Sequence, residues 1–322
     1  MKQRILYIFT RTPLHVGAGS SVGAIDQPVQ RERHTGFPII PASSLKGSFA
    51  DAWTQDYFPG ENGGRLRVKT MKNGKDTVLE EAKESAWLFG SDDASLSFAG
   101  SLLFCEARLL AFPIRSARGG FAWVTCPLIL ARAARDGVLG KNLIPEFPKA
   151  TDGQPDRGDE FAFFTGNGPL ALGDKVVLEE YTFTRIGNDE AAKVGTAMAG
   201  LLAGDPVWNE VSSRLVILDD GMMSFFVQNA CEVAQHVRID DETGVAASGA
   251  LFNQENVPSE TLFYALVNGT HARHRHFDGK TEDDALNSFE AKLKSAKVCQ
   301  FGGDASTGLG FCTVEFGKGL VE

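Results

Sequence analysis

Residues 4–10 read Arg-Ile-Leu-Tyr-Ile-Phe-Thr, and a glycine-rich segment follows at residues 12–26, Thr-Pro-Leu-His-Val-Gly-Ala-Gly-Ser-Ser-Val-Gly-Ala-Ile-Asp. The β-branched and aromatic residues of 4–10 predict a strand. A second glycine-rich segment, residues 302–310, reads Gly-Gly-Asp-Ala-Ser-Thr-Gly-Leu-Gly and precedes a strand-like run at 311–316. Glycine lets the backbone approach a ligand closely and turn its N–H groups toward an anion. Two such loops predict a site for a phosphate-rich ligand.

Working outward from these loops, the chain predicts an α+β fold with the order β–α–β, then β–α–β. Ser43 or Ser44 caps a helix that reaches about Tyr57, and a strand follows near 101–110. A strand at 262–267, a helix with a capping box at Thr281-Glu-Asp-Asp and the closing strand complete the pattern. This order is that of a ferredoxin-like split fold, which also serves RNA-recognition domains.

We expect a single domain over residues 1–322 with two insertions. A helical region occupies about 51–100. A β-hairpin occupies about 228–258, because the segment 231–253 alternates loosely around the turn Asp-Asp-Glu-Thr-Gly at 240–244. Further strand-like runs recur at 175–184 and 214–218.

Composition excludes several classes of protein. No apolar run approaches the ~20 residues of a membrane span. The five cysteines show no Cys-x-x-Cys spacing, which favours reduced thiols in a cytoplasmic protein over a zinc site or a disulfide framework. The net charge of −9 argues against a generic basic nucleic-acid binder. Residues 1–50 nevertheless hold six Lys and Arg against two Asp and Glu, so a local basic groove and chance clustering both remain open.

Two motifs allow a structural interpretation as well as a functional one. Ser43-Ser44-Leu45-Lys46 matches the Ser-x-x-Lys of acyl-serine hydrolases, but the Ser-Asp-Asn and Lys-Thr-Gly elements are missing. We favour anion binding by Lys46, which lies near the start of a helix. A surface lysine without a ligand is the alternative. His271, His274 and His276 resemble a metal cluster, but interleaved arginines favour a basic loop. Neither a P-loop nor a dinucleotide fingerprint is present, so ATP or NAD binding has weak support.

His15 and Asp26 share the N-terminal loop. Histidine suits proton transfer near neutral pH, and a carboxylate can orient a hydroxyl or hold a divalent ion. From the residue types alone, His15 and Asp26 could be catalytic or could simply be exposed loop residues.

The segments Thr12–Gly19, Asp26–Arg31 and Pro38–Gly47, together with the loop 302–310, closely resemble the backbone subunits of type III-B CRISPR effector complexes. These Cmr complexes are built from RAMP (repeat-associated mysterious) proteins. The hairpin 232–257 resembles the thumb of such subunits. The resemblance spans nearly the whole chain and is weakest over 140–215. It implies a ferredoxin-like RAMP palm with a helical insertion and a thumb hairpin.

The resemblance implies an RNA-guided endoribonuclease acting in antiviral defence. Copies of the chain would form a helical filament along a CRISPR guide RNA, together with other Cmr subunits. No membrane partner is expected. Each copy would cut complementary target RNA once, leaving a 2′,3′-cyclic phosphate and a 5′-hydroxyl. By position Asp26 corresponds to the family's cleavage residue and would hold a weakly bound Mg²⁺ or Mn²⁺. His15 is a candidate proton donor or phosphate contact.

The family also tends to have an acidic–aromatic pair before the proline that ends the thumb. Here the stretch is Gln254-Glu255-Asn256-Val257, which puts a catalytic role there in doubt. The residues expected to hold RNA are Lys46, Ser43, Ser44, Gly17, Gly19, Arg31, Gly302, Gly303, Ser306, Thr307 and Gly308. Three alternatives remain: a non-catalytic guide-RNA scaffold, a processing enzyme for precursor guide RNA and a nucleotide-dependent enzyme.

Overall fold

A computed structural model describes residues 2–19, 23–55, 83–91, 97–148, 160–274 and 277–317. Its palm is an antiparallel sheet with the strand order β15-β16-β1-β14-β6. The strands are β1 (Lys2–Thr10), β6 (Ala107–Ser116), β14 (Leu262–Gly269), β15 (Val298–Gln300) and β16 (Phe311–Gly317), with β2 (Ile39–Ile40) beside β6 and β5 (Leu102–Phe104) beside β14. The path β16-β1-β14-β6 places the first and third strands centrally, as in a ferredoxin-like fold.

Two helices pack against each other on the palm, α1 (Ala42–Gln55) and α7 (Glu282–Ser295). The ring centroids of Phe49 and Phe289 lie 5.0 Å apart, and those of Phe289 and Phe316 on β16 lie 4.9 Å apart. The other face of β1 is covered as well, because Phe9 packs on Trp208 at 5.3 Å. Burial on both faces explains why β1 has a nearly continuous apolar run.

The middle of the chain departs from the prediction, because six strands close into a barrel. Neighbouring strands in the barrel lie in the order β6, β7 (Gly120–Thr125), β11 (Leu215–Ile217), β8 (Phe161–Phe164), β10 (Tyr181–Arg185) and β9 (Lys175–Leu178). The last strand, β9, pairs with β6 again, where Leu178 lies opposite Ser116. The α+β class and the palm order are therefore confirmed, but the sequence reading missed the barrel. The barrel strands are short and irregularly spaced, so the hydrophobic residues of this region show no recognisable periodicity in the sequence.

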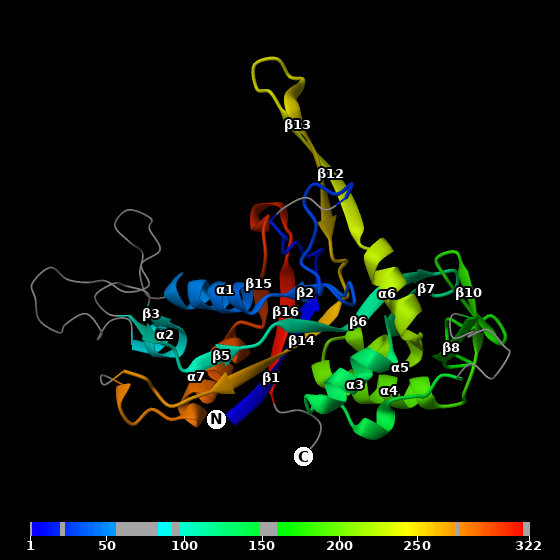
Figure 1. The fold of residues 1–322 in the computed structure, drawn as a ribbon, viewed down its shortest axis with the longest axis horizontal. Coiled ribbons are helices and arrows are strands. Elements are labelled where there is room, and N and C mark those ends of the chain that lie inside the picture. Colours follow the sequence, from blue (N-terminus) through cyan, green and yellow to red (C-terminus); the bar gives the residue numbers. More distant parts are fainter. Residues whose placement is uncertain are drawn as a thin grey trace, which may run out of the picture.

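Short helices surround this barrel, which lies on the opposite side of the palm from α1 and α7 (Figure 1). They are α3 (Pro127–Arg135), α4 (Glu190–Ala199), α5 (Val211–Arg214), α6 (Asp220–Asn229) and the 3₁₀ turns η2 (Lys141–Leu143), η4 (Gly200–Leu202) and η5 (Trp208–Glu210). Within the described residues, no helix is long and apolar enough to cross a membrane.

The predicted hairpin is present and projects from the body as a thumb (Figure 1). Strand β12 (Glu232–Ile239) pairs with β13 (Ala246–Asn256) from Glu232 opposite Asn256 to Ile239 opposite Ala246. Most of the predicted insertion at 51–100 lies outside the described residues. Its described parts include the end of α1, the helix α2 (Lys83–Phe89) and the short strands β3 (Gly90–Ser91) and β4 (Phe98–Ala99).

The capping box of α7 is confirmed, with Thr281 and Asp284 in reciprocal hydrogen bonds. All five cysteines are free thiols, as predicted, although Cys105 is exposed and only Cys126 and Cys312 are fully buried.

Candidate active site and nucleic-acid interface

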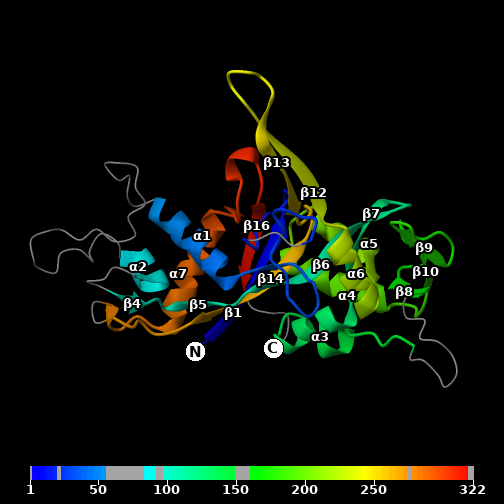
Figure 2. The same ribbon diagram turned by 45° about the horizontal axis from the view of Figure 1, so that its top comes forward.

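Three segments that are far apart in sequence meet at the base of the thumb. The N-terminal loop joins the end of β13 where Leu14 and Val257 exchange backbone hydrogen bonds of 2.8 and 2.9 Å. The glycine-rich loop joins both, because the Gly303 amide donates to the His15 carbonyl and the Gln254 amide group donates to Asp304. Figure 2 shows the blue loop after β1 and the red loop before β16 side by side below the thumb.

Asp26 lies on the surface of this junction. Its backbone N–H donates to the side-chain Oδ1 of Asn253 at 2.8 Å, and the Asn253 backbone N–H donates to Asp26 Oδ2 at 2.9 Å. Oδ1 of Asp26 makes no hydrogen bond to the described part of the chain. The carboxylate is therefore held by one oxygen, and the other is available to a ligand.

His15 lies deeper, with 7% of its surface exposed. Its Nδ1 is 2.7 Å from the Glu255 carbonyl oxygen. A carbonyl only accepts, so Nδ1 carries the hydrogen and the neutral ring has its lone pair on Nε2. Nε2 faces Gly17, where a Cβ atom would lie only 2.9 Å away. Gly17 thus makes room for the imidazole.

The residues of the glycine-rich loop differ in role. Gly302 has φ +77°, and a Cβ atom there would lie 2.1 Å from the His15 carbonyl oxygen, so close backbone packing requires glycine. Gly308 also has positive φ but has no neighbouring atom within 4 Å. Ser306 and Thr307 are exposed on the 3₁₀ turn η7 (Ala305–Thr307), next to exposed Gly303. The outer part of this loop therefore presents backbone and hydroxyl groups to solvent.

The middle of helix α1 packs next to this loop, since Phe49 contacts Phe301, the residue before Gly302. The helix starts at Ala42, earlier than predicted, so Lys46 lies in its second turn rather than its first. Lys46 and Ser43 are exposed and Ser44 is partly so. Gly19 has positive φ and open space around it.

Arg31 has a structural position, although we predicted an RNA contact. Its guanidinium donates to the carbonyls of Gly36 and Val227, to the Cys231 sulfur and to Glu255 Oε1 at 2.5 Å. Because these protein groups occupy its donors, Arg31 ties the N-terminal loop to α6 and to the thumb base.

The roles of two residues of the site were not predicted from the sequence. Glu255 was considered only as a doubtful catalytic group, but it is 3% exposed and pairs with Arg31 while accepting from the Val29 amide. Asn253 belongs to no motif, and only the pairing of β13 with the N-terminal loop reveals its contacts with Asp26. Neither residue has a signal in a single sequence.

A divalent cation fits this site only together with a ligand. Among the described residues, no group of three or more His, Cys, Asp or Glu side chains could hold a metal ion. Asp26 supplies one available carboxylate oxygen, and Mg²⁺ is often held by one or two carboxylates plus substrate phosphates. The donor set therefore suits a weakly held ion shared with a polyanion.

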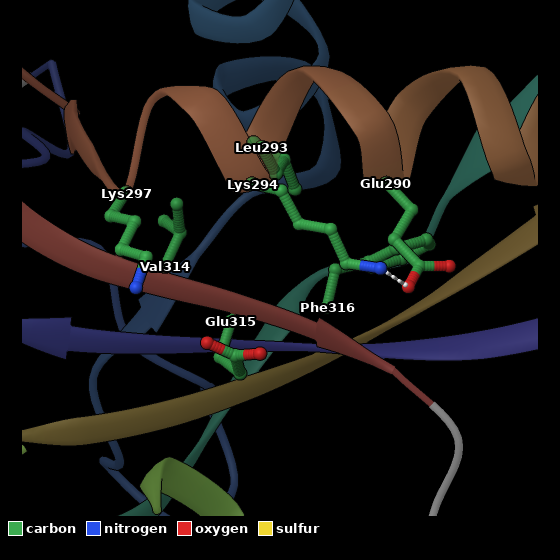
Figure 3. Close-up of a pocket in the computed structure, with 7 residues that line it drawn as sticks. All are labelled: Glu290, Leu293, Lys294, Lys297, Val314, Glu315 and Phe316. Carbon is green, nitrogen blue, oxygen red and sulfur yellow. Dashed lines mark ion pairs between the residues drawn. The ribbon is translucent and has the colours of Figure 1, made fainter. Parts of the chain in front are cut away.

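Other hollows lie away from the junction. A groove of about 240 Å³ runs between α7 and the end of β16, where Lys294 and Glu290 form an ion pair (Figure 3). A polar cavity of about 730 Å³ lies on the barrel and includes Arg118 and Arg185. Neither hollow contains a predicted site residue.

The comparisons with known proteins agree with this architecture. A family model described as the RAMP superfamily matches residues 8–313. The Cmr endoribonuclease Cmr4 of Pyrococcus furiosus is 31% identical over 98% of this chain and 95% of its own length. A crystal structure of oligomeric Cmr4 from Pyrococcus furiosus superimposes with a TM-score of 0.64 at 26% identity, covering 98% of both chains.

A chain from a cryo-EM structure of a type III-B Cmr-beta complex bound to cognate target RNA gives a TM-score of 0.68 at 19% identity. It covers 98% of this chain and 97% of that one, and at this identity the likeness is one of fold. The matches span the palm, barrel and thumb together and confirm the resemblance drawn from the glycine-rich loops. The chain belongs to the RAMP superfamily.

Proposed function

We propose that this chain is a guide-RNA-binding backbone subunit of a type III-B CRISPR effector complex, and that it cleaves complementary target RNA at regular intervals. The observation that carries the proposal is the exposed Asp26 carboxylate at the junction of the N-terminal loop, the thumb base and the glycine-rich loop. The homologue of similar length that is named a Cmr endoribonuclease supports it.

The proposed reaction is a displacement at phosphorus. The ribose 2′-hydroxyl of a displaced target nucleotide attacks the adjacent phosphorus, and the bond to the 5′-oxygen of the next nucleotide breaks. Asp26 accepts the hydroxyl proton through its available oxygen, and the 5′-oxygen takes up a proton. The products are a 2′,3′-cyclic phosphate and a 5′-hydroxyl. His15 can supply the second proton from Nε2 only in its doubly protonated form, because Nδ1 is bound to a carbonyl.

Asp26 would hold a Mg²⁺ or Mn²⁺ ion, which would supply stabilisation of the charge on the reacting phosphate. Lys46 and the exposed backbone of residues 303–308 would contact guide-RNA phosphates. Amide N–H groups bind phosphate without added positive charge, which is compatible with the net charge of −9. The oligomeric relative and the Cmr complexes support partners that include further copies in a filament and other Cmr subunits. We also propose a cytoplasmic location, which the five free cysteines support.

The decisive experiment measures cleavage of labelled target RNA by the assembled, guide-loaded complex with Mg²⁺ or Mn²⁺. Asp26→Ala is expected to lower the single-turnover rate by at least about 100-fold, the usual contribution of a positioned acid or base. Assembly and target affinity should stay unchanged. Asp174→Asn, which alters an exposed carboxylate on the barrel, serves as the matched control.

Regularly spaced products that disappear in Asp26→Ala support the proposal. Equal cleavage by wild type and Asp26→Ala would move the chemistry to another residue or subunit. A complex that binds target but never cuts it would leave the chain as a guide-RNA scaffold.

A further inference from the structure

Asn253 is bonded to the segment around Asp26 more extensively than any strand pairing requires. Its side-chain Oδ1 accepts from the Asp26 amide at 2.8 Å, and its Nδ2 donates to the Ala24 carbonyl at 3.0 Å. Its backbone N–H donates to the Asp26 carboxylate at 2.9 Å, and its carbonyl accepts from the Gln27 amide at 3.1 Å. Four hydrogen bonds from one residue thus hold residues 24–27.

These bonds fix both the position and the orientation of the Asp26 carboxylate. The backbone N–H of Asn253 occupies Oδ2, so the remaining oxygen is the one that can face a ligand. The side-chain bonds hold the exposed backbone of Ala24 and Asp26, which belong to no helix or strand. Misplacement of a reacting group by about 1 Å can cost about 100-fold in rate, so such a clamp has a kinetic consequence.

The contacts are specific to this position of the hairpin. Gln235 lies directly opposite Asn253 on β12, is exposed, and makes no side-chain hydrogen bond to the described residues. Asn253 also belongs to β13, so a displacement of the base of the thumb would move Asn253 and, through it, Asp26. The Asp26 carboxylate accepts a hydrogen bond from strand β13. Figure 2 shows that this strand continues into the thumb.

We propose that Asn253 is the positioning residue for Asp26, coupling the seating of the thumb to the placement of the cleavage carboxylate. This inference rests on the proposed function, in which Asp26 acts on the target 2′-hydroxyl. Asn253 touches no reacting atom in this scheme. Its contribution is to the rate of cleavage at saturating target RNA and not to the affinity for that RNA.

The test compares Asn253→Ala, Asn253→Asp and Gln235→Ala in the assembled, guide-loaded complex, with Asp26→Ala measured beside them. Single-turnover cleavage at saturating target RNA gives the rate, and a binding titration gives the affinity. Asn253→Ala is expected to lower the rate by about 10- to 100-fold with affinity within about twofold of wild type. Asn253→Asp keeps an oxygen for the Asp26 amide, but it loses the Nδ2 donor to the Ala24 carbonyl and places a second negative charge beside Asp26, so it should be at least as slow as Asn253→Ala. Gln235→Ala should behave as wild type.

Hydrogen exchange supplies a readout that does not depend on activity. Exchange over residues 23–27 should rise in Asn253→Ala and stay unchanged in Gln235→Ala. The proposal is overturned if Asn253→Ala cleaves within twofold of wild type, if rate and affinity fall together, or if Asn253→Asp cleaves at the wild-type rate. If Asp26→Ala cleaves normally, the proposed function fails first, and the positioning role fails with it.

Discussion

At the scale of single residues, the ion pair of Arg31 and Glu255 holds the candidate site together. The two side chains are 19% and 4% exposed, so both charges are largely removed from water. Glu255 also accepts from the Val29 amide with its second oxygen, and its carbonyl accepts from His15. The carboxylate of Glu255 therefore ties the N-terminal loop to the thumb, and its backbone carbonyl holds the imidazole.

Removal of the Glu255 carboxylate should be costly because it leaves the Arg31 guanidinium buried without its counter-charge. Breaking a buried pair from one side costs about 3–5 kcal/mol, so we expect Glu255→Ala to lower the free energy of unfolding by roughly that amount. Urea unfolding measures it. Glu180→Ala is the control, because the Arg115–Glu180 pair is 67% and 79% exposed and should contribute about 0–1 kcal/mol. Equal effects of the two substitutions would contradict the assignment.

Glu260, in the turn between the thumb and β14, gives a prediction for pH dependence. Burial and the neighbouring Asp205 raise the pKa of this half-buried carboxyl from 4.5 to about 7, with Arg11 opposing them. The folded chain therefore keeps a proton that the unfolded chain releases, so this group makes stability fall as pH rises from about 4.5 to about 7. Above that window its effect is level.

Glu260→Gln removes this titration. The melting temperature of Glu260→Gln relative to wild type should rise steadily from pH 5 to pH 7.5. A difference that is independent of pH would show that Glu260 does not titrate in this range. Comparing the two proteins at each pH cancels the groups that they share.

At the scale of elements, the glycine-rich loop is shaped by how closely its backbone approaches the N-terminal loop. Gly302 and Gly308 both have positive φ, but only Gly302 lies against the His15 carbonyl. Of these two glycines, Gly302 is required by packing and Gly308 by backbone conformation alone.

Alanine at these two positions should separate the effects. Gly308→Ala should lower the free energy of unfolding by about 1–2 kcal/mol, the cost of a left-handed conformation for a residue with a Cβ atom. Gly302→Ala meets the same strain plus a backbone clash and should cost clearly more. Chemical denaturation of both variants checks the ranking, and a smaller loss at Gly302 would refute it.

At the scale of the whole molecule, the palm and the barrel share strand β6 and a continuous core. Trp123 on β7 packs on Trp208, which packs on Phe9 of the palm, with both centroid distances at 5.3 Å. Trp123 Nε1 also donates to the Glu260 carbonyl at 2.8 Å. No polar boundary separates the two parts along this contact, so they should behave as one cooperative unit.

We therefore expect a single unfolding transition. In the double variant Trp123→Phe/Trp208→Phe the remaining tryptophans, Trp53 and Trp87, report on the palm side, and the reverse double variant reports on the barrel. In each variant the fluorescence and far-UV circular dichroism midpoints should coincide. Separate midpoints would show that barrel and palm unfold independently.

The correctly predicted elements of the palm and the thumb depend on local chemistry. The run 4–10, the capping box at Thr281 and the turn 240–244 between two alternating segments each depend on neighbours along the chain, and the structure contains all three. The barrel was not predicted from the sequence, because its strands other than β6 are only three to six residues long. In addition, pairs such as Ser116 and Leu178 join segments that are distant in the chain.

The sequence by itself determined the family, the order of the palm elements and the two loops that form the candidate site. Glycine, proline and cap residues determine the backbone conformation within a few positions of themselves, so their effects can be predicted from the sequence. Tertiary structure alone decided that Arg31 pairs with Glu255, that His15 donates from Nδ1, and that Asn253 holds Asp26. Those contacts join residues more than 200 positions apart, and their geometry exists only once β13 lies against the N-terminal loop.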